Sequence, residues 1–129
     1  MSHYTGTIIE ESLEDKAVLE KVKIVSTRVE QVCDRHKTPW LGFWTIHEIH
    51  VPITKGKIIA QEISHSIDQD DEHHWYADFK NKSYHYIIYR DKVFCVDRSN
   101  DEQYHAAIRY GVMSGIPIEQ LNFSNEPKK

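Results

Sequence analysis

The sequence has few of the residues from which familiar cofactor and redox sites are built. It contains only five glycines in 129 residues and no glycine-rich phosphate loop, so a nucleotide cradle is not expected. Its two cysteines, Cys33 and Cys95, form no CxxC pattern, and each is expected to be a small buried side chain with a reduced thiol. The sequence therefore predicts neither a cofactor nor a resident metal.

Long apolar runs and clusters of basic residues are also missing. No apolar run approaches the roughly 18 residues of a membrane span, and residues 1–11 lack the basic and apolar segments of a signal peptide. The net charge is -4 and Lys and Arg never bunch, whereas nucleic-acid binding needs a basic surface. We expect a cytoplasmic protein that binds neither membranes nor nucleic acid.

What is present is an ordinary globular composition that is rich in histidine. Apolar residues make up 40% and charged residues 28% of the chain, which is enough for one core. We predict a single α+β domain over residues 1–124 and a disordered tail over 125–129. Nine His, seven Tyr and three Trp have apolar bodies with polar tips, which suit ligand clefts and interfaces.

The first half of the chain has strand and helix patterns in alternation. The residue pattern predicts a short strand or an ordered arm at 7–11, a short helix at 12–21, a half-buried strand at 23–32, a strand at 40–53 and a helix at 54–67. Ser12 and Thr54 are expected to cap the two helices. Untidy alternation in the strand at 40–53 predicts a β-bulge near His47.

The second half predicts a three-stranded meander and a long helix. The strands are expected at 75–79, 84–90 and 93–98, with tight turns at Asn81-Lys82 and Asp91-Lys92. A capping box, Ser99 with Glu102, starts the helix and Gly115 ends it. The expected buried stripe of this helix is Tyr104, Ala107, Ile108, Gly111 and Val112.

These elements together indicate an α+β fold. We predict a two-layer sandwich in which a largely antiparallel sheet has both helices packed on one face, in a loosely ferredoxin-like arrangement.

The meander places a polar row across its strands. With the turns just given, Asp78 faces His85 and His85 faces Arg98. The apolar face of the meander, expected beneath the helices, is Trp75, Ala77, Phe79, Tyr84, Tyr86, Ile88, Val93 and Cys95. The other face is His74, Tyr76, Asp78, His85, Ile87, Tyr89, Phe94, Val96 and Arg98.

This row can be interpreted as a site or as a solvated surface. A carboxylate beside an imidazole fixes its tautomer, so Asp78 and His85 could form an acid–base pair, and Arg98 could hold an anion. Tyr76, His74 and Tyr89 would line such a ligand site. Alternatively the row is a set of exposed charge pairs, each contributing a few tenths of a kcal/mol.

Two other histidine groups are weaker candidates. His73 and His74 follow three acids in the segment 70–72, which could attract a divalent ion, but flexible acidic loops are usually only solvated. His47 and His50 are three apart on a predicted strand, where they point to opposite faces, so they are not a ligand pair.

Several segments together resemble a family of small uncharacterised bacterial proteins. They are the residues 4–13, 38–40, 75–81, 85–90 and 110–123, which include Gly115-Ile116-Pro117. The resemblance implies no activity, cofactor or site residue.

Two functional hypotheses follow from the sequence. The first is a binding module for a small molecule or a protein, which forms a homodimer through its aromatic surface and an open sheet edge. The second is a small enzyme with His85 as acid–base group, Asp78 as its orienting partner and Arg98 as an anion clamp.

Overall fold

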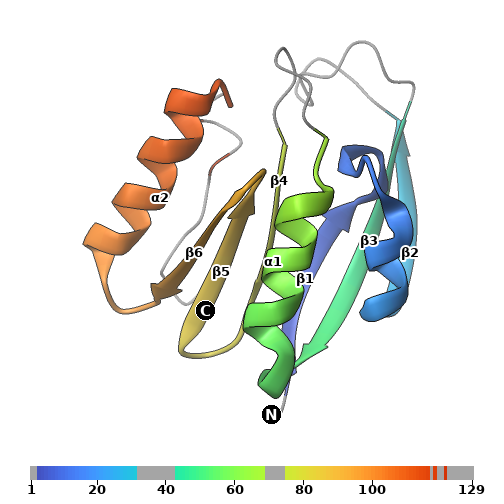
Figure 1. Ribbon diagram of the computed structural model, residues 1–129, viewed down its shortest axis with the longest axis horizontal. Coiled ribbons are helices and arrows are strands. Elements are labelled where there is room, and N and C mark those ends of the chain that lie inside the picture. The colour runs from blue at the N-terminus through green and yellow to red at the C-terminus, as the bar shows by residue number, and fades with distance from the viewer. Residues whose placement is uncertain (1–2, 32–42, 69–74, 117, 119–120, 122–129) are drawn as a thin grey trace.

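The computed structural model describes residues 3–31, 43–68, 75–116, 118 and 121. Its centre is a six-stranded antiparallel sheet, curled into a half-barrel, in the order β2-β3-β1-β4-β5-β6 (Figure 1). The α+β class and the antiparallel sheet are therefore confirmed. The strands are β1 His3–Ile9, β2 Lys23–Gln31, β3 Phe43–Pro52, β4 Tyr76–Lys80, β5 Tyr84–Tyr89 and β6 Lys92–Asp97. The two α-helices are α1 Gly56–Ser66 and α2 Asp101–Ser114.

The chain path combines a split crossover with a meander. Strands β3 and β4, which flank helix α1 in the sequence, both pair antiparallel with β1 and so run parallel to each other on either side of it. Strands β4, β5 and β6 then follow as the predicted meander. This topology is not clearly ferredoxin-like, because β2 extends the sheet beyond β3, and a meander rather than a second crossover follows β4.

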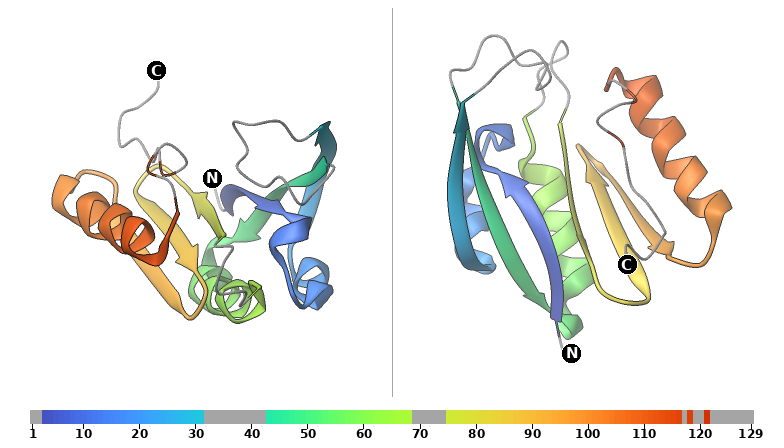
Figure 2. Two further views of the ribbon diagram at one scale, coloured as in Figure 1. Left: turned by 90° about the horizontal axis from the view of Figure 1, so that it is seen from above. Right: turned by 180° about the vertical axis from the view of Figure 1, so that it is seen from behind.

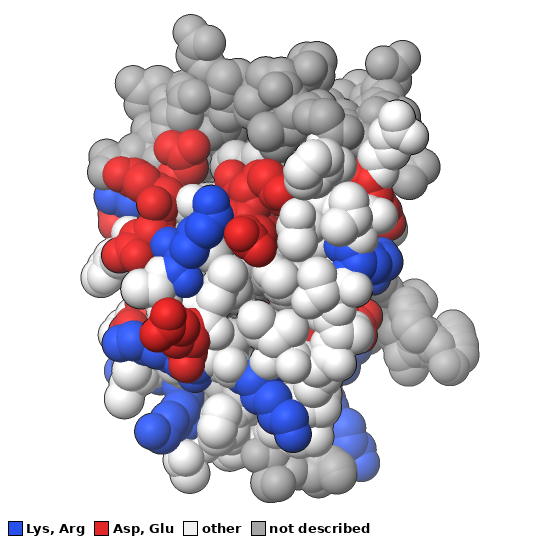
Figure 3. Space-filling view, turned by 90° about the vertical axis from the view of Figure 1, so that its right-hand side faces the viewer, with Lys and Arg blue, Asp and Glu red and all other residues white. Residues whose placement is uncertain are grey.

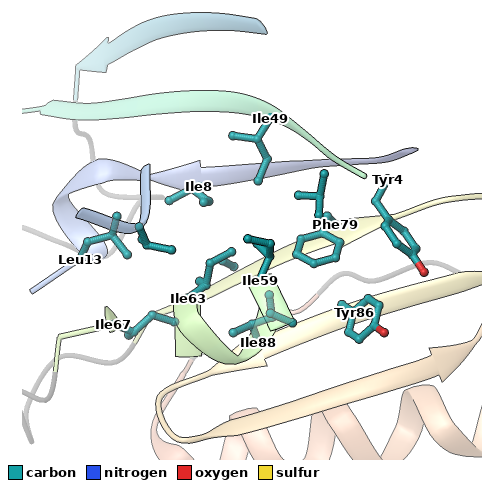
Figure 4. Packing of buried hydrophobic residues seen from close by; sticks show 14 of the residues in the cluster. Tyr4, Ile8, Leu13, Ile49, Ile59, Ile63, Ile67, Phe79, Tyr86 and Ile88 are labelled. Carbon is teal, nitrogen blue, oxygen red and sulfur yellow. The ribbon is translucent and has the colours of Figure 1, made fainter. Parts of the chain in front are cut away.

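Helix α1 covers one face of the sheet. Ile59, Ile63 and Ile67 are at most 4% exposed, as their spacing predicts, and pack in one cluster with Phe79 and Ile88 (Figure 4). Fully burying each such aliphatic or aromatic side chain contributes about 1.5–3 kcal/mol. This cluster is the larger of the two cores and fixes β1, β3, β4 and β5 beneath the helix.

Helix α2 covers the opposite face, so the prediction of both helices on one face is wrong. Alternate residues of β5 point to opposite sides: Ile88 belongs to the α1 cluster, whereas Ile87 and Tyr89 pack with Tyr104 and Ala107 of α2. The view from above shows the two helices on either side of this part of the sheet (Figure 2, left). Strand β5 is buried on both faces, as its apolar run allows.

Two of the predicted helix caps are wrong. Residues 12–21 do not form one helix from Ser12: short 3-10 turns span Glu10–Ser12 and Lys16–Lys21, and the Asp15 side chain accepts from the backbone N–H of Ala17. Thr54 lies in a 3-10 turn, Ile53–Lys55, and α1 has no side-chain cap. Asp15 is as good an N-cap residue type as Ser12, which is why the sequence did not separate them.

The ends of α2 are partly as predicted. Asn100, not Ser99, is the N-cap and its side chain accepts from the N–H of Gln103 at 3.1 Å. Gly115 ends the helix in the left-handed conformation with φ 109°, which confirms the predicted stop. Gly111 is buried against β5, but Val112 is 43% exposed and does not belong to the buried stripe.

Strand β2 is the least buried element of the sheet. Residues 23–29 are all exposed, so the prediction of a half-buried strand is wrong, because neither helix covers this edge. The β-bulge lies in β2 between Ile24 and Ser26, whereas β3 is regular at His47, where the sequence predicted it. Cys95 on β6 is also exposed rather than buried, and Cys33 lies outside the described residues.

In the described part of the chain, no helix has the length and apolar character that a membrane span requires.

Candidate functional site

The structure brings the predicted polar row together, beneath helix α2. Nε2 of His85 lies 2.7 Å from Oδ2 of Asp78, and Nδ1 of His85 lies 3.0 Å from the hydroxyl of Tyr104. His85 is only 1% exposed. The row is therefore a hydrogen-bonded group around a buried histidine rather than the open surface that the sequence predicted.

The contact between Asp78 and His85 arises from a register different from the predicted one. Asp78 is directly opposite Ile87, and His85 is opposite Lys80 on one side and Val96 on the other. Each of the two tight turns lies one residue away from its predicted position. The pairing of β4 with β5 and of β5 with β6 is therefore shifted by two residues from the predicted pairing. Because two is the repeat of a strand, every side chain keeps its predicted face and the row is now joined diagonally.

Arg98 lies at the end of this polar row, beyond Tyr104. Its Nη1 donates to the backbone oxygen of Asn81 at 2.8 Å, and its guanidinium lies near the Tyr104 hydroxyl. Its Nε atom is buried and has no partner in the described part of the chain. Arg98 thus ties the β4–β5 turn to the end of β6, where the sequence predicted an open anion clamp.

The positions of the protons on His85 and Tyr104 follow from the hydrogen-bond donors and acceptors around them. The carboxylate of Asp78 accepts from Nε2–H of His85, which leaves Nδ1 as an acceptor for the Tyr104 O–H. Burial raises the pKa of Tyr104, while the hydrogen bond and charge of Arg98 act to lower it. Tyr104 therefore stays a phenol and donates to His85. Both ring nitrogens of His85 are occupied.

A shallow cavity opens beside Arg98. Its volume is about 320 Å³, and its lining residues are Lys82, Ser83, Tyr84, Asp97, Arg98 and Ser99. The carboxylate of Asp97 accepts from the backbone N–H and the hydroxyl of Ser99, at 2.9 and 2.7 Å. Positively and negatively charged side chains thus line the same cavity, so its lining does not favour binding of an anion.

Tyr76 and Tyr89, two of the other predicted ligand residues, are not among the described residues that line this cavity. Tyr89 is 2% exposed and donates to the backbone oxygen of Ala107 at 2.7 Å, and Tyr76 packs edge-on against it. Burial raises the pKa of both phenols. Both are core residues under α2. His74, with the acidic segment 70–72 and His73, lies outside the described residues.

A second histidine–carboxylate pair was missed from the sequence. Nε2 of His47 lies 2.8 Å from Oε1 of Glu10, and Nδ1 lies 2.8 Å from the hydroxyl of Thr27. His47 lies on β3, Thr27 on β2 and Glu10 in a 3-10 turn, and the two partners are 20 and 37 positions from His47 in the sequence. No local spacing could have indicated this group, because it depends on the order β2-β3-β1 in the sheet.

Neither histidine belongs to a metal centre as far as the structure describes the chain. Among those residues, no group of three or more His, Cys, Asp or Glu side chains is placed to hold a metal ion.

Comparison with models of protein families, with curated proteins and with solved structures finds no match for this chain. The resemblance to small bacterial proteins stays a prediction. The function must be argued from the residues alone.

Proposed function

We propose that the protein is a binding module whose interaction surface is the free edge of β2, and that its partner there is a second copy of the chain. The observation that supports this proposal is the exposure of β2. Its residues 23–29 are exposed, and among the described strands β3 is the only one that pairs with it. A long edge with unpaired backbone groups is a template for another strand.

The edge also has apolar side chains whose exposure to water is unfavourable. Ile24, Val25 and Val29 are 39%, 42% and 62% exposed, and Phe43 on the neighbouring strand is 52% exposed. Figure 3 shows this side of the molecule, where uncharged side chains form a continuous strip between separate basic and acidic groups. Burying this strip against a partner would remove apolar area from water at about 25 cal/mol per Å².

The charges of β2 favour one antiparallel register with a second copy. A two-fold axis at Val29 places Arg28 opposite Glu30 of the other copy, twice, and Thr27 opposite Gln31. Arg28 and Glu30 already lie side by side, 3.3 Å apart. Opposite charges directly across a strand pair contribute roughly 0.2–1 kcal/mol each, whereas centring the pair on Arg28 would oppose two like charges.

Other features of the edge would limit this pairing to one partner. The β-bulge between Ile24 and Ser26 twists the strand, and Lys23 places a charge at its beginning. Bulges and lysines are the devices by which natural edges avoid open-ended aggregation. A short, charge-matched ladder at Arg28–Glu30 is compatible with a dimer rather than a fibre.

The acid–base enzyme receives less support from the geometry. His85 has both ring nitrogens occupied and is 1% exposed, so no substrate atom reaches it without movement of α2. A general base must lie within hydrogen-bond reach of the proton that it removes.

The proposal is tested by measuring mass in solution over a range of concentrations, up to about 1 mM, the scale of weak association. The wild type is expected to shift from monomer to dimer, and Val29→Lys to remain monomeric. Ile58→Lys is the matched control, because Ile58 is 58% exposed on α1, away from β2, and should leave the dimer intact.

A charge-exchange experiment tests the register itself. Arg28→Glu and Glu30→Arg should each weaken self-association, because like charges then face each other. An equal mixture of the two variants should associate again, because opposite charges face each other at both positions. A wild type that stays monomeric throughout, or a dimer indifferent to Val29→Lys, would refute the proposal.

A further inference from the structure

We propose that Thr27, His47 and Glu10 form a reactive site in which Thr27 is a nucleophile toward carboxylic esters. The hydroxyl of Thr27 lies 2.8 Å from Nδ1 of His47, and Nε2 of the same ring lies 2.8 Å from the carboxylate of Glu10. A hydroxyl joined to a base that a third group orients is the arrangement by which proteins activate weak nucleophiles. The inference does not depend on strand pairing at β2.

The hydrogen-bond roles in this group follow from its chemistry. A carboxylate only accepts, so Glu10 keeps the ring proton of His47 on Nε2. The lone pair of Nδ1 then points to Thr27, and the Thr27 hydroxyl donates to it. This is the protonation state in which a histidine takes a proton from a hydroxyl.

The sheet holds the base rigidly and leaves the nucleophile accessible. His47 is 7% exposed between Ile8 of β1 and Thr27 of β2, which are its direct neighbours in the sheet. Thr27 is exposed to solvent on the outermost strand. The β-bulge between Ile24 and Ser26 ends one residue before Thr27, and bulges are common beside active sites because they change the direction of a side chain.

A second carboxylate fixes the turn that supplies Glu10. Glu11 accepts from the backbone N–H of Thr45 at 2.7 Å and from its hydroxyl at 2.9 Å. Thr45 therefore helps to position Glu10 by holding the residue next to it.

The reaction with an ester balances as an acyl transfer followed by hydrolysis. Oγ1 of Thr27 attacks the carbonyl carbon while its proton passes to Nδ1 of His47, and the ester C–O bond breaks to release the alcohol with that proton. Water then attacks the acyl-threonine, again giving a proton to Nδ1, and the acid leaves as Thr27 recovers its hydroxyl hydrogen. Ester and water become acid and alcohol, and His47 is unchanged.

The probe for this site is p-nitrophenyl acetate, followed by nitrophenolate release and by peptide mass mapping. We expect one acetyl group on Thr27. Thr27→Val should lower the reaction by about 100-fold, the lower range for a positioned base, whereas Thr27→Ser should retain it. Thr54→Val, at an exposed threonine in the 3-10 turn Ile53–Lys55, should leave it unchanged. Equal rates for the two valine variants, or acetyl groups only at other residues, would overturn the proposal.

Glu10 acts through His47 and is a positioning residue, so its test needs a second readout. Nitrogen NMR of His47 should show the Nε2–H tautomer as the main form in the wild type and a mixture in Glu10→Ala, together with slower acetylation of Thr27. Slower acetylation with an unchanged tautomer would contradict the assigned role of Glu10. Circular dichroism of each variant establishes that it is folded.

Discussion

His85 and Tyr104 share a hydrogen bond of 3.0 Å that joins the sheet to helix α2. Tyr104→Phe keeps the ring but leaves Nδ1 of the buried His85 without its donor. An unsatisfied buried polar group costs about 1–3 kcal/mol, so the free energy of unfolding measured in urea should fall by that amount.

Tyr84→Phe is the control for this change. Tyr84 is 46% exposed, and surface substitutions usually alter stability by no more than about 0.5 kcal/mol. If Tyr104→Phe changed the free energy of unfolding no more than Tyr84→Phe, the hydrogen bond between His85 and Tyr104 would not stabilise the fold.

The faces of the meander could be predicted from the sequence, but its register could not. Alternation fixes which residues share a face, and this was correct for Asp78, His85 and Arg98. The exact turn is decided by local contacts, such as the Asn81 side chain accepting from the N–H groups of Ser83 and Tyr84 at 2.8 Å. Moving a two-residue turn by one position leaves the faces unchanged, so the three residues lie near one another despite the wrong pairing.

The position of α2 could not be predicted for a different reason. The pattern of β5, His85 to Tyr89, is apolar on both sides, and such a run allows a helix on either face. The polar face was predicted to be open, either as a ligand site or as a solvated surface, because the sequence does not show that Tyr104 lies beside Asp78, His85 and Arg98. In the structure Tyr104 supplies the partner that permits their burial.

The acid stability of the protein should depend in part on Asp97. Hydrogen bonds from the N–H and hydroxyl of Ser99 lower the pKa of this exposed carboxyl. A lowered folded pKa adds stability above the unfolded value, about 3.9, and that stability is lost as the pH falls through the folded pKa. Carbon NMR should give an Asp97 pKa below that of a model peptide.

Ser99→Ala identifies the cause of this shift. It removes the hydroxyl donor but keeps the backbone N–H, so the pKa of Asp97 should rise part of the way to its ordinary value. An Asp97 that titrates identically in wild type and Ser99→Ala would show that the hydroxyl contact has no effect in solution.

At alkaline pH the buried phenols should govern stability. Burial raises the pKa of Tyr76 and Tyr89 above the ordinary value of about 10. A raised folded pKa contributes stability that is complete below pH 10 and is lost as the pH rises toward the folded value, because the unfolded chain ionises first. Urea unfolding at increasing pH should show this decline, and Tyr76→Phe should make it shallower. The exposed Tyr84→Phe should leave the slope as it is.

The approach of α2 to β5 gives the sharpest test of the fold. A Cβ atom added at Gly111 would lie 2.7 Å from the Tyr89 hydroxyl and 2.8 Å from Cδ1 of Leu121. Gly111→Ala gains up to about 1 kcal/mol of helix propensity, but overpacking of a core usually costs about 1–3 kcal/mol. We expect a net loss of stability.

A double-mutant cycle separates these terms. Tyr89→Phe alone loses the bond to the Ala107 oxygen, but it also removes the atom nearest the new methyl group. Gly111→Ala should therefore cost less in the Tyr89→Phe background than in the wild type, with a coupling of at least about 0.5 kcal/mol, as is typical of residues in contact. Strict additivity would mean that α2 does not lie against β5 at Gly111, and the covering of His85 by this helix would be wrong as well.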